Sequence, residues 1–80
     1  KVMPNPFSGQ TTFSILTNGY EYQRAQIKVT NQLGALADVI TIGKGITQYV
    51  YHNDKLQKGI YYYALELDSK KVKTGKLVIQ

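Results

Sequence analysis

Apolar and polar side chains alternate along most of this chain, and short clusters of turn-forming residues interrupt the alternation. The clearest example is segment 22–30, in which Ala25, Ile27 and Val29 alternate with polar side chains. Successive side chains of a β-strand point to opposite faces, so this pattern predicts a strand with one buried face. No segment combines the apolar spacing of a helix with capping residues, so no helix is predicted.

The same alternation predicts about seven short strands. Pro4, Asn5 and Pro6 predict a turn or an edge segment at the start, because proline lacks the backbone N–H that a central strand donates. Short strands separated by turns about every 8–12 residues are typical of a small antiparallel sandwich, so the chain is predicted to be all-β. The other strands are predicted at 10–17, 22–30, 36–42, 46–52, 60–67 and 72–80.

Two turns carry specific expectations. Asn18-Gly19 is the strongest hairpin signal in the chain, because both residues tolerate positive φ. It predicts that the strands on either side of it pair. Gly34 is expected in the left-handed conformation, where it closes the turn at 31–34. A four-residue turn is predicted at 68–71.

Two apolar features have a less certain place in this pattern. Segment 36–42 is more uniformly apolar than the others, which predicts either a strand buried on both faces or the least regular strand. Leu56 is the lone apolar residue of a polar loop, and we expect it to plug one open end of the sandwich.

The composition fits one small globular domain spanning residues 1–80. Hydrophobic residues make up 42% of the chain and charged residues 19%, which lies in the ordinary globular range. The chain has no Cys, which excludes a disulfide scaffold and the usual structural zinc sites. No apolar run approaches the roughly 20 residues of a transmembrane segment, and the start lacks the apolar region of a signal peptide. Because it does not open with Met, the chain is expected to be a piece of a longer protein.

No set of residues predicts catalysis, a metal or a cofactor. His52 is the only His, and we interpret it as a surface loop residue. The sequence contains no nucleophile elbow, no close pair of acids suited to glycosidase chemistry and no calcium loop. Gly43-Lys44-Gly45 is too short for a phosphate loop, and no helix follows it. The expected catalytic, metal and cofactor sets are therefore empty.

The net charge of +5 admits a nucleic-acid or anionic-lipid partner. The lysines are scattered, however, and the chain holds a single Arg. Lysines on solvent-exposed faces and sheet edges discourage edge-to-edge pairing, and this is the interpretation we favour. No nucleic-acid partner is predicted.

The tyrosines allow two interpretations. Strand alternation places Tyr61 and Tyr63 toward the core and Tyr62 on the opposite face, since three consecutive residues of a strand cannot share a face. The alternative is an exposed platform of Tyr49, Tyr51 and Tyr62, as on a carbohydrate-binding sandwich. An inert spacer between catalytic domains is a third possibility.

Three patterns occur in order along the chain, and together they resemble a known family. They are Pro4-Asn5-Pro6-Phe7 with Thr12, Phe13 and Ile15; Ile27-Lys28-Val29 leading to Asn31, Leu33 and Gly34; and Leu56 to Tyr63 followed by Gly75-Lys76-Leu77-Val78-Ile79. This set resembles the type A C-terminal sorting domain of the type IX secretion system of Bacteroidetes, and the resemblance covers essentially the whole chain.

The resemblance implies an immunoglobulin-like sandwich of seven strands at the C-terminus of a larger secreted protein. It implies a non-catalytic sorting signal that the outer-membrane translocon recognises, and export of the attached cargo to the cell surface or outside. It also implies a sortase-like peptidase that often removes the domain. The residues that match the recognition elements of the family are Pro4, Asn5, Pro6, Gly34, Gly59, Tyr61, Lys76, Leu77 and Val78. Of these, Lys76 and the proline-rich start are the stronger candidates for direct contact, since the others can be explained by the fold.

Overall fold

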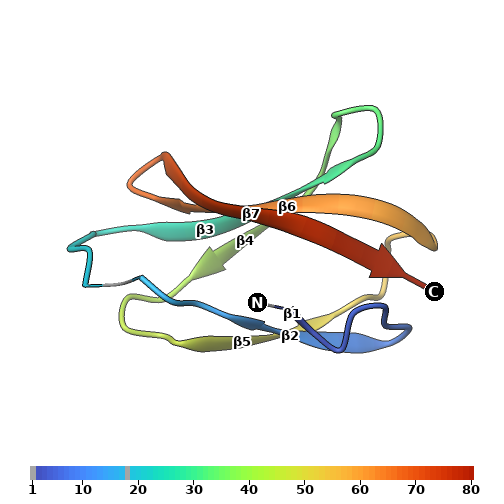
Figure 1. Cartoon of the computed structure of the whole chain (residues 1–80), viewed down its shortest axis with the longest axis horizontal. Coiled ribbons are helices and arrows are strands. Elements are labelled where there is room, and N and C mark those ends of the chain that lie inside the picture. The colour runs from blue at the N-terminus through green and yellow to red at the C-terminus, as the bar shows by residue number, and fades with distance from the viewer. Residues whose placement is uncertain (1, 18) are drawn as a thin grey trace.

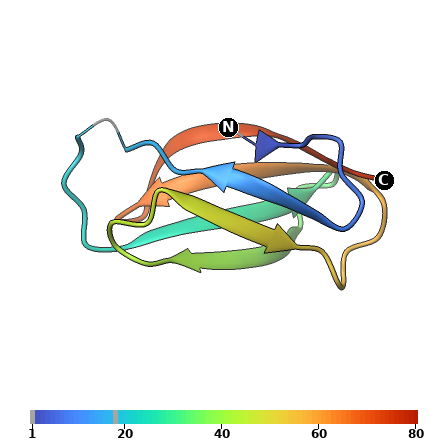
Figure 2. The same cartoon turned by 90° about the horizontal axis from the view of Figure 1, so that it is seen from below.

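The computed structural model describes residues 2–17 and 19–80, and this part of the chain folds as a two-layer β-sandwich (Figures 1 and 2). One sheet has the strand order β1-β2-β5 and the other β4-β3-β6-β7, with antiparallel pairing between neighbours. The predicted all-β immunoglobulin-like sandwich is confirmed. Its strands are β1 (Val2–Met3), β2 (Gln10–Ser14), β3 (Ala25–Asn31), β4 (Leu36–Ile42), β5 (Gln48–His52), β6 (Gly59–Leu67) and β7 (Lys70–Ile79). None of the described segments is a helix long and apolar enough to cross a membrane.

The alternation in the sequence correctly assigns the buried face of the central strand β3. Ala25, Ile27 and Val29 are each at most 2% exposed, whereas the side chains between them lie on the outer face. In β6, Tyr63 is buried, Tyr61 packs half-buried against the core and Tyr62 is 44% exposed, as predicted. Period-two geometry therefore fixes which side of each sheet enters the core.

Aromatic rings join the two layers. Phe13 of β2 packs edge to face against Tyr51 of β5, at 6.0 Å between ring centroids, and against Tyr63 of the opposite sheet, at 5.3 Å. Edge-to-face contacts of this kind favour stability beyond the area they bury. Leu56 packs half-buried against the same core from the β5–β6 loop, as expected for a plug.

The predicted hairpin at Asn18-Gly19 is wrong. Strand β2 pairs with β1 and β5, whereas β3 pairs with β4 and β6 in the other sheet. The connection between them buries Ile15 and Tyr22 and so crosses from one layer to the other along the core. Gly19 has a positive φ of 78°, and Asn18 lies outside the described residues. A local signal for a turn does not determine whether the flanking strands share a sheet.

The β6–β7 connection is tighter than predicted. Asp68 and Ser69 both have positive φ, 51° and 70°, as in a two-residue type I′ hairpin turn, so β7 begins at Lys70 instead of residue 72. The Asp68 carboxylate accepts hydrogen bonds from the backbone N–H groups of Gln23 and Arg24, at 3.0 and 2.9 Å. The turn is thereby tied to the start of β3.

Strand β4 pairs irregularly with β3, and it is not buried on both faces. It lies at the edge of its sheet, where its register with β3 shifts between Val29 and Thr30. Ile40 and Ile42 are buried, but Val39 is 43% exposed because the outer face of this sheet is open to solvent. Of the two alternatives for segment 36–42, burial on both faces is therefore wrong. Its pairing with β3 is irregular, as is the pairing of β6 with β7, whose register shifts between Leu65 and Glu66.

A close approach between β6 and β7 requires a glycine. Tyr63 and Gly75 are register partners, and a Cβ atom on Gly75 would lie 2.5 Å from the Tyr63 hydroxyl oxygen. The Tyr63 ring cannot easily move away, because it is buried and packs against Phe13. The ring of Tyr63 therefore occupies the space that any side chain at position 75 would need.

We expect Gly75→Ala to destabilise the domain by about 1–3 kcal/mol, as overpacked core substitutions do. Gly9→Ala is the matched control, since no atom lies within 4 Å of the Cβ position there. Reduced backbone entropy of the unfolded chain should make a strain-free Gly→Ala change neutral or stabilising. Urea unfolding of both variants measures the difference, and equal stability of the two would contradict the assigned packing of Tyr63.

Candidate recognition surface

The side chain of Asn5 holds the proline-rich start of the chain against the last strand. Its amide Nδ2 donates to the Lys76 carbonyl at 2.8 Å, and its Oδ1 accepts from the Val78 N–H at 2.9 Å. Both backbone groups lie on the edge of β7 that β6 does not pair. A single side chain thus satisfies a donor and an acceptor of a sheet edge more than 70 residues away in the sequence.

Phe7 continues this contact as an isolated parallel β-bridge to Ile79. Its N–H donates to the Val78 carbonyl at 3.0 Å, and its carbonyl accepts from the Gln80 N–H at 2.7 Å. The Phe7 ring is 3% exposed and packs edge to face on Tyr51 at 6.4 Å. The segment from Pro4 to Phe7, here called the N-terminal latch, is therefore bonded to the edge of β7 and anchored in the core.

The latch also contacts β2. Thr11, which is 1% exposed, donates its hydroxyl to the Pro4 carbonyl. The Met3-Pro4 and Asn5-Pro6 peptide bonds are both cis. Pro4, Asn5 and Pro6 are exposed on their outer side, so the latch presents a surface as well as a contact.

Five of the other matched residues, Gly59, Tyr61, Lys76, Leu77 and Val78, lie along the junction of β6 and β7. Tyr61 is the register partner of Leu77, and Gly59 is the partner of Ile79. Leu77 is fully buried, whereas Tyr61 is half-buried and donates its hydroxyl to the Gln57 carbonyl at 2.7 Å. Gly59 has a φ of 154°, in the region that favours glycine. Val78 is half-buried between the latch and β6.

Gly34 lies apart from these residues but at the same end of the sandwich. Its φ of 88° confirms the predicted left-handed conformation, and its N–H donates to the Asn31 carbonyl at 3.0 Å. The Asn31 side chain accepts from the N–H groups of Leu33 and Ala35, and Asn31 pairs with Tyr61 across the β3–β6 ladder. The β3–β4 turn, the β5–β6 loop and the C-terminus all meet at this end (Figure 1).

The structure therefore brings eight of the nine matched residues to one place, around the C-terminal half of β7. Sequence reasoning missed three residues that build it: Phe7, Thr11 and Gly75. Proline spacing and alternation give no signal for any of them, because each acts through a partner that is distant in the sequence. Phe7 and Gly75 belong to the patterns of the resemblance but were not singled out as site residues.

A polar contact ties the two sheets on the opposite side of the molecule. The Tyr51 hydroxyl donates to Asp38 Oδ2 at 2.8 Å, and Lys55 Nζ lies 3.1 Å from Asp38 Oδ1. Burial raises the pKa of Asp38, but the hydrogen bond from Tyr51, the ion pair with Lys55 and the Val39 N–H outweigh it, so the pKa lies below 3.8. Burial raises the pKa of Tyr51, and the Asp38 carboxylate raises it further. These groups are a structural tie between β4 and β5.

The proposed tyrosine platform does not form. Tyr51 is 4% exposed and Tyr49 packs half-buried against the core, whereas Tyr62 lies on the outer face of the other sheet. Stacking on a sugar needs rings exposed on one surface, and these three do not share one. Across residues 2–17 and 19–80, no three His, Asp or Glu side chains gather in a way that could hold a metal ion.

Comparison with known proteins gives one match. The family model described as "Secretion system C-terminal sorting domain" matches residues 1–80, the whole chain. No curated protein and no solved structure matches this chain.

We expect Asn5→Ala to destabilise the domain by about 1 kcal/mol, the usual net effect of losing a hydrogen bond whose partners can return to water. Asn5→Asp keeps the acceptor for the Val78 N–H but turns a carboxylate oxygen toward the Lys76 carbonyl oxygen, so it should destabilise the domain at least as much as Asn5→Ala. Thermal unfolding of the two variants and the wild type measures the order of their stabilities. An Asn5→Ala variant as stable as the wild type would show that the two hydrogen bonds of the Asn5 side chain contribute nothing to the fold.

Asp38 should make stability depend on pH in the acid range. Because its pKa is lowered in the folded state, its ionised form stabilises the fold above 3.8, and this contribution disappears as the pH falls through 3.8 toward the lowered value. We expect Asp38→Asn to be less stable than the wild type near neutral pH and the two to converge on acidification. Urea unfolding at about pH 6 and about pH 3 tests this, with the exposed-site variant Asp54→Asn as the control of equal charge. A gap between Asp38→Asn and the wild type that does not change with pH would contradict the prediction.

Proposed function

Since the chain belongs to the secretion system C-terminal sorting domain family, we propose that it is a non-catalytic recognition domain. In this proposal the secretion machinery binds the folded domain at the latch and β7. Domains of this family are sorting signals of type IX secretion, and the chain directs export across the outer membrane to the cell surface or outside. The finer proposal concerns which residues the machinery contacts and whether the domain is removed after export.

The observation that carries the proposal is the convergence of matched residues on one structural element. Residues that the sequence resemblance assigns to recognition lie far apart in the sequence and meet at the C-terminal half of β7, where Asn5 bonds to Lys76 and Val78. A translocon that reads a folded domain needs a surface that exists only when the domain is folded. The junction of the latch with β7 has this property, because neither segment alone presents it.

Burial and backbone conformation divide the matched residues into those that we propose touch a partner and those that form the fold. Leu77 is fully buried, so its place in the pattern reflects the fold. Pro4, Asn5, Pro6 and Lys76 are exposed around the same edge. We assign direct contact to these four residues. Gly34 and Gly59 are also exposed, but their positive φ values account for glycine at these positions. Tyr61 and Val78 are half-buried, so we assign a fold-forming role to both of them, to the two glycines and to Leu77.

The proposal that the domain is non-catalytic rests on the family and on the use of its polar groups. The family is one of sorting signals and is not known to be catalytic. Three of the five acids serve structural contacts: Asp38 with Tyr51 and Lys55, Asp68 with backbone N–H groups, and Glu66 with Gln26 and Lys28.

We further propose that the cargo precedes β1 and that a sortase-like peptidase separates it from the domain there. Strand β1 has only two residues, pairs only with β2 and leaves Met3 58% exposed. Chain that leads into such a short edge strand is accessible to a peptidase without unfolding the sandwich. This proposal fits removal of the domain after export.

Export of a reporter tests the proposal. We expect residues 1–80, fused to the C-terminus of a periplasmic reporter in a Bacteroidetes host, to bring the reporter to the cell surface or the medium. Deleting residues 72–80 should abolish export, because this removes most of β7 and the partner of the latch. Activity of the reporter outside intact cells is the measurement, and export that survives the deletion would contradict the proposal.

A further inference from the structure

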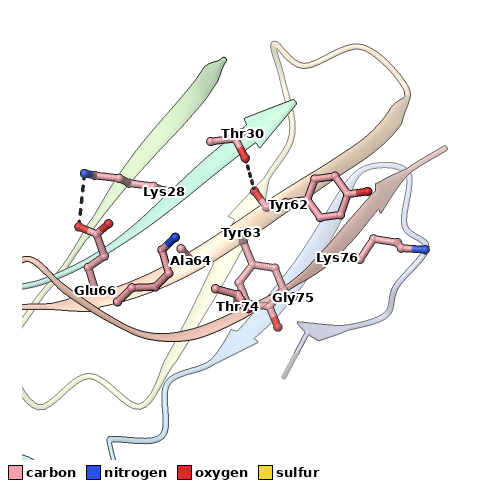
Figure 3. Close-up of a pocket in the computed structure, with 10 residues that line it drawn as sticks. Lys28, Thr30, Tyr62, Tyr63, Ala64, Glu66, Thr74, Gly75 and Lys76 are labelled. Atoms are coloured by element: carbon pink, nitrogen blue, oxygen red, sulfur yellow. Dashed lines mark hydrogen bonds and ion pairs between the residues drawn. The ribbon is translucent and has the colours of Figure 1, made fainter. Parts of the chain in front are cut away.

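The outer face of the four-stranded sheet carries a shallow groove that the core and the latch do not use. It has a volume of about 410 Å³ and runs across β3, β6 and β7 (Figure 3). Ala64 lies at its middle, with Lys28 and Thr74 as its register partners on the two sides. Because Ala64 is short and its neighbours are long, the sheet surface is recessed there. We call this feature the outer groove.

One end of the outer groove presents an aromatic ring beside a lysine. Tyr62 is the register partner of Lys76 on β7 and of Thr30 on β3. The Tyr62 side chain is 44% exposed, and Figure 3 shows its ring on the same side of the sheet as Lys76. The groove thus combines an apolar floor with a flat ring, which suits an apolar side chain of a partner.

The charges around the outer groove are unequal. Lys28, Lys71 and Lys76 line it, and Glu66 is its single acid. Glu66 is already engaged, since Gln26 donates to it at 3.1 Å and Lys28 Nζ lies 3.3 Å away. The hydrogen bond from Gln26 and then the ion pair with Lys28 lower the pKa of Glu66, so it stays ionised and holds Lys28. Within the described residues, no acid lies in ion-pair range of Lys71 or Lys76.

From this geometry we propose that the outer groove binds an acidic polypeptide segment of the secretion machinery, with carboxylates on Lys71 and Lys76 and an apolar side chain over Ala64 and Tyr62. This inference rests on the proposed function, because it names the chemistry of the partner that reads the surface near Lys76. Complementary charges across an interface steer association and set register, and the apolar floor adds contact area.

The shape of the outer groove favours a protein over a lipid surface. A bilayer is flat on the scale of this domain, so it would meet the tips of the lysines and leave the recessed floor empty. A polypeptide can place an apolar side chain on the floor between two acids. Nucleic-acid phosphates would also meet only the lysines, and the chain has one Arg, Arg24, which does not line the groove.

Charge reversal in the reporter fusion tests the inference. The groove variant is Lys71→Glu with Lys76→Glu, and the control is Lys44→Glu with Lys58→Glu, which changes the net charge equally at exposed sites outside the groove. We expect the groove variant to reduce export about tenfold or more, as loss of charge pairs worth at least 1.4 kcal/mol would. The control should export like the wild type.

A neutral variant separates the loss of binding from destabilisation of the fold. Lys71 is the register partner of Glu66, so a Glu at position 71 faces a like charge and can weaken the sheet. Lys71→Gln with Lys76→Gln removes the positive charges without this repulsion, and thermal unfolding establishes that each variant is folded. If the folded neutral variant exports as well as the wild type, the inference is wrong and Lys76 is not a contact residue, but the sorting function itself, which export of the wild-type fusion tests, is unaffected. If the wild-type fusion itself is not exported, the proposed function is wrong.

Two further measurements identify the class of partner. A photo-reactive benzoylphenylalanine at position 62 should cross-link, in cells, to a peptide rich in Asp and Glu, and the adduct should disappear in the groove variant. Vesicles of phosphatidylcholine and phosphatidylglycerol test the lipid alternative. Vesicle binding that the groove variant loses and the control retains would assign the groove to anionic lipid and overturn the inference.

Discussion

The docking of the N-terminal latch on the free edge of β7 is the contact on which the rest of this fold depends. β7 is the last strand of its sheet, and without the latch its outer N–H and C=O groups would face solvent over its whole length. Asn5 and Phe7 pair with the C-terminal half, which also contains the fully buried Leu77. Because Phe7 reaches Tyr51 in the core, the same segment joins the edge of one sheet to the interior of the sandwich.

The two halves of the β7 edge are protected by different means. The C-terminal half is paired by the latch, whereas the other half holds Lys70, Lys71 and Lys73 and no acid. Lysines on an uncovered edge discourage pairing with another chain. The same strand thus provides a bonded surface at one end and a positively charged surface beside the outer groove. Both surfaces exist only while β6 and β7 remain paired, which makes recognition conditional on folding.

Much of this architecture could be predicted from local pattern alone. Alternation correctly placed Ile27 and Val29 in the core and Tyr62 outside, because the two faces of a strand are fixed by geometry. The choice of strand partners was beyond local pattern, and for this reason Asn18-Gly19 gave a wrong hairpin. The conformation of a turn is local, but whether the flanking strands share a sheet depends on residues such as Ile15 and Tyr22, which take the chain across the core.

The site was predictable only through the family resemblance, and its construction was not predictable. The resemblance selected Asn5, Lys76 and Val78, but no feature of the sequence indicated that one side chain would bond to the other two residues. The need for glycine at position 75 was not predictable either. It arises because the β6–β7 register places the Tyr63 ring beside Gly75, and that register is not evident from the sequence. Four of the nine lysines lie within residues 70–76, so this cluster is visible in the sequence, but only the strand order shows that they lie on the edge strand of a sheet.

Amide hydrogen exchange at Val78 and Gln80 tests the central contact most directly. Both N–H groups point away from β6 and are bonded only through Asn5 and Phe7. If the latch is part of the cooperative fold, these two amides should exchange as slowly as those in the interior of β6, through global unfolding. Exchange of Val78 and Gln80 at the rate of a free peptide, with β6 still protected, would show that the edge of β7 is open and that the account is wrong.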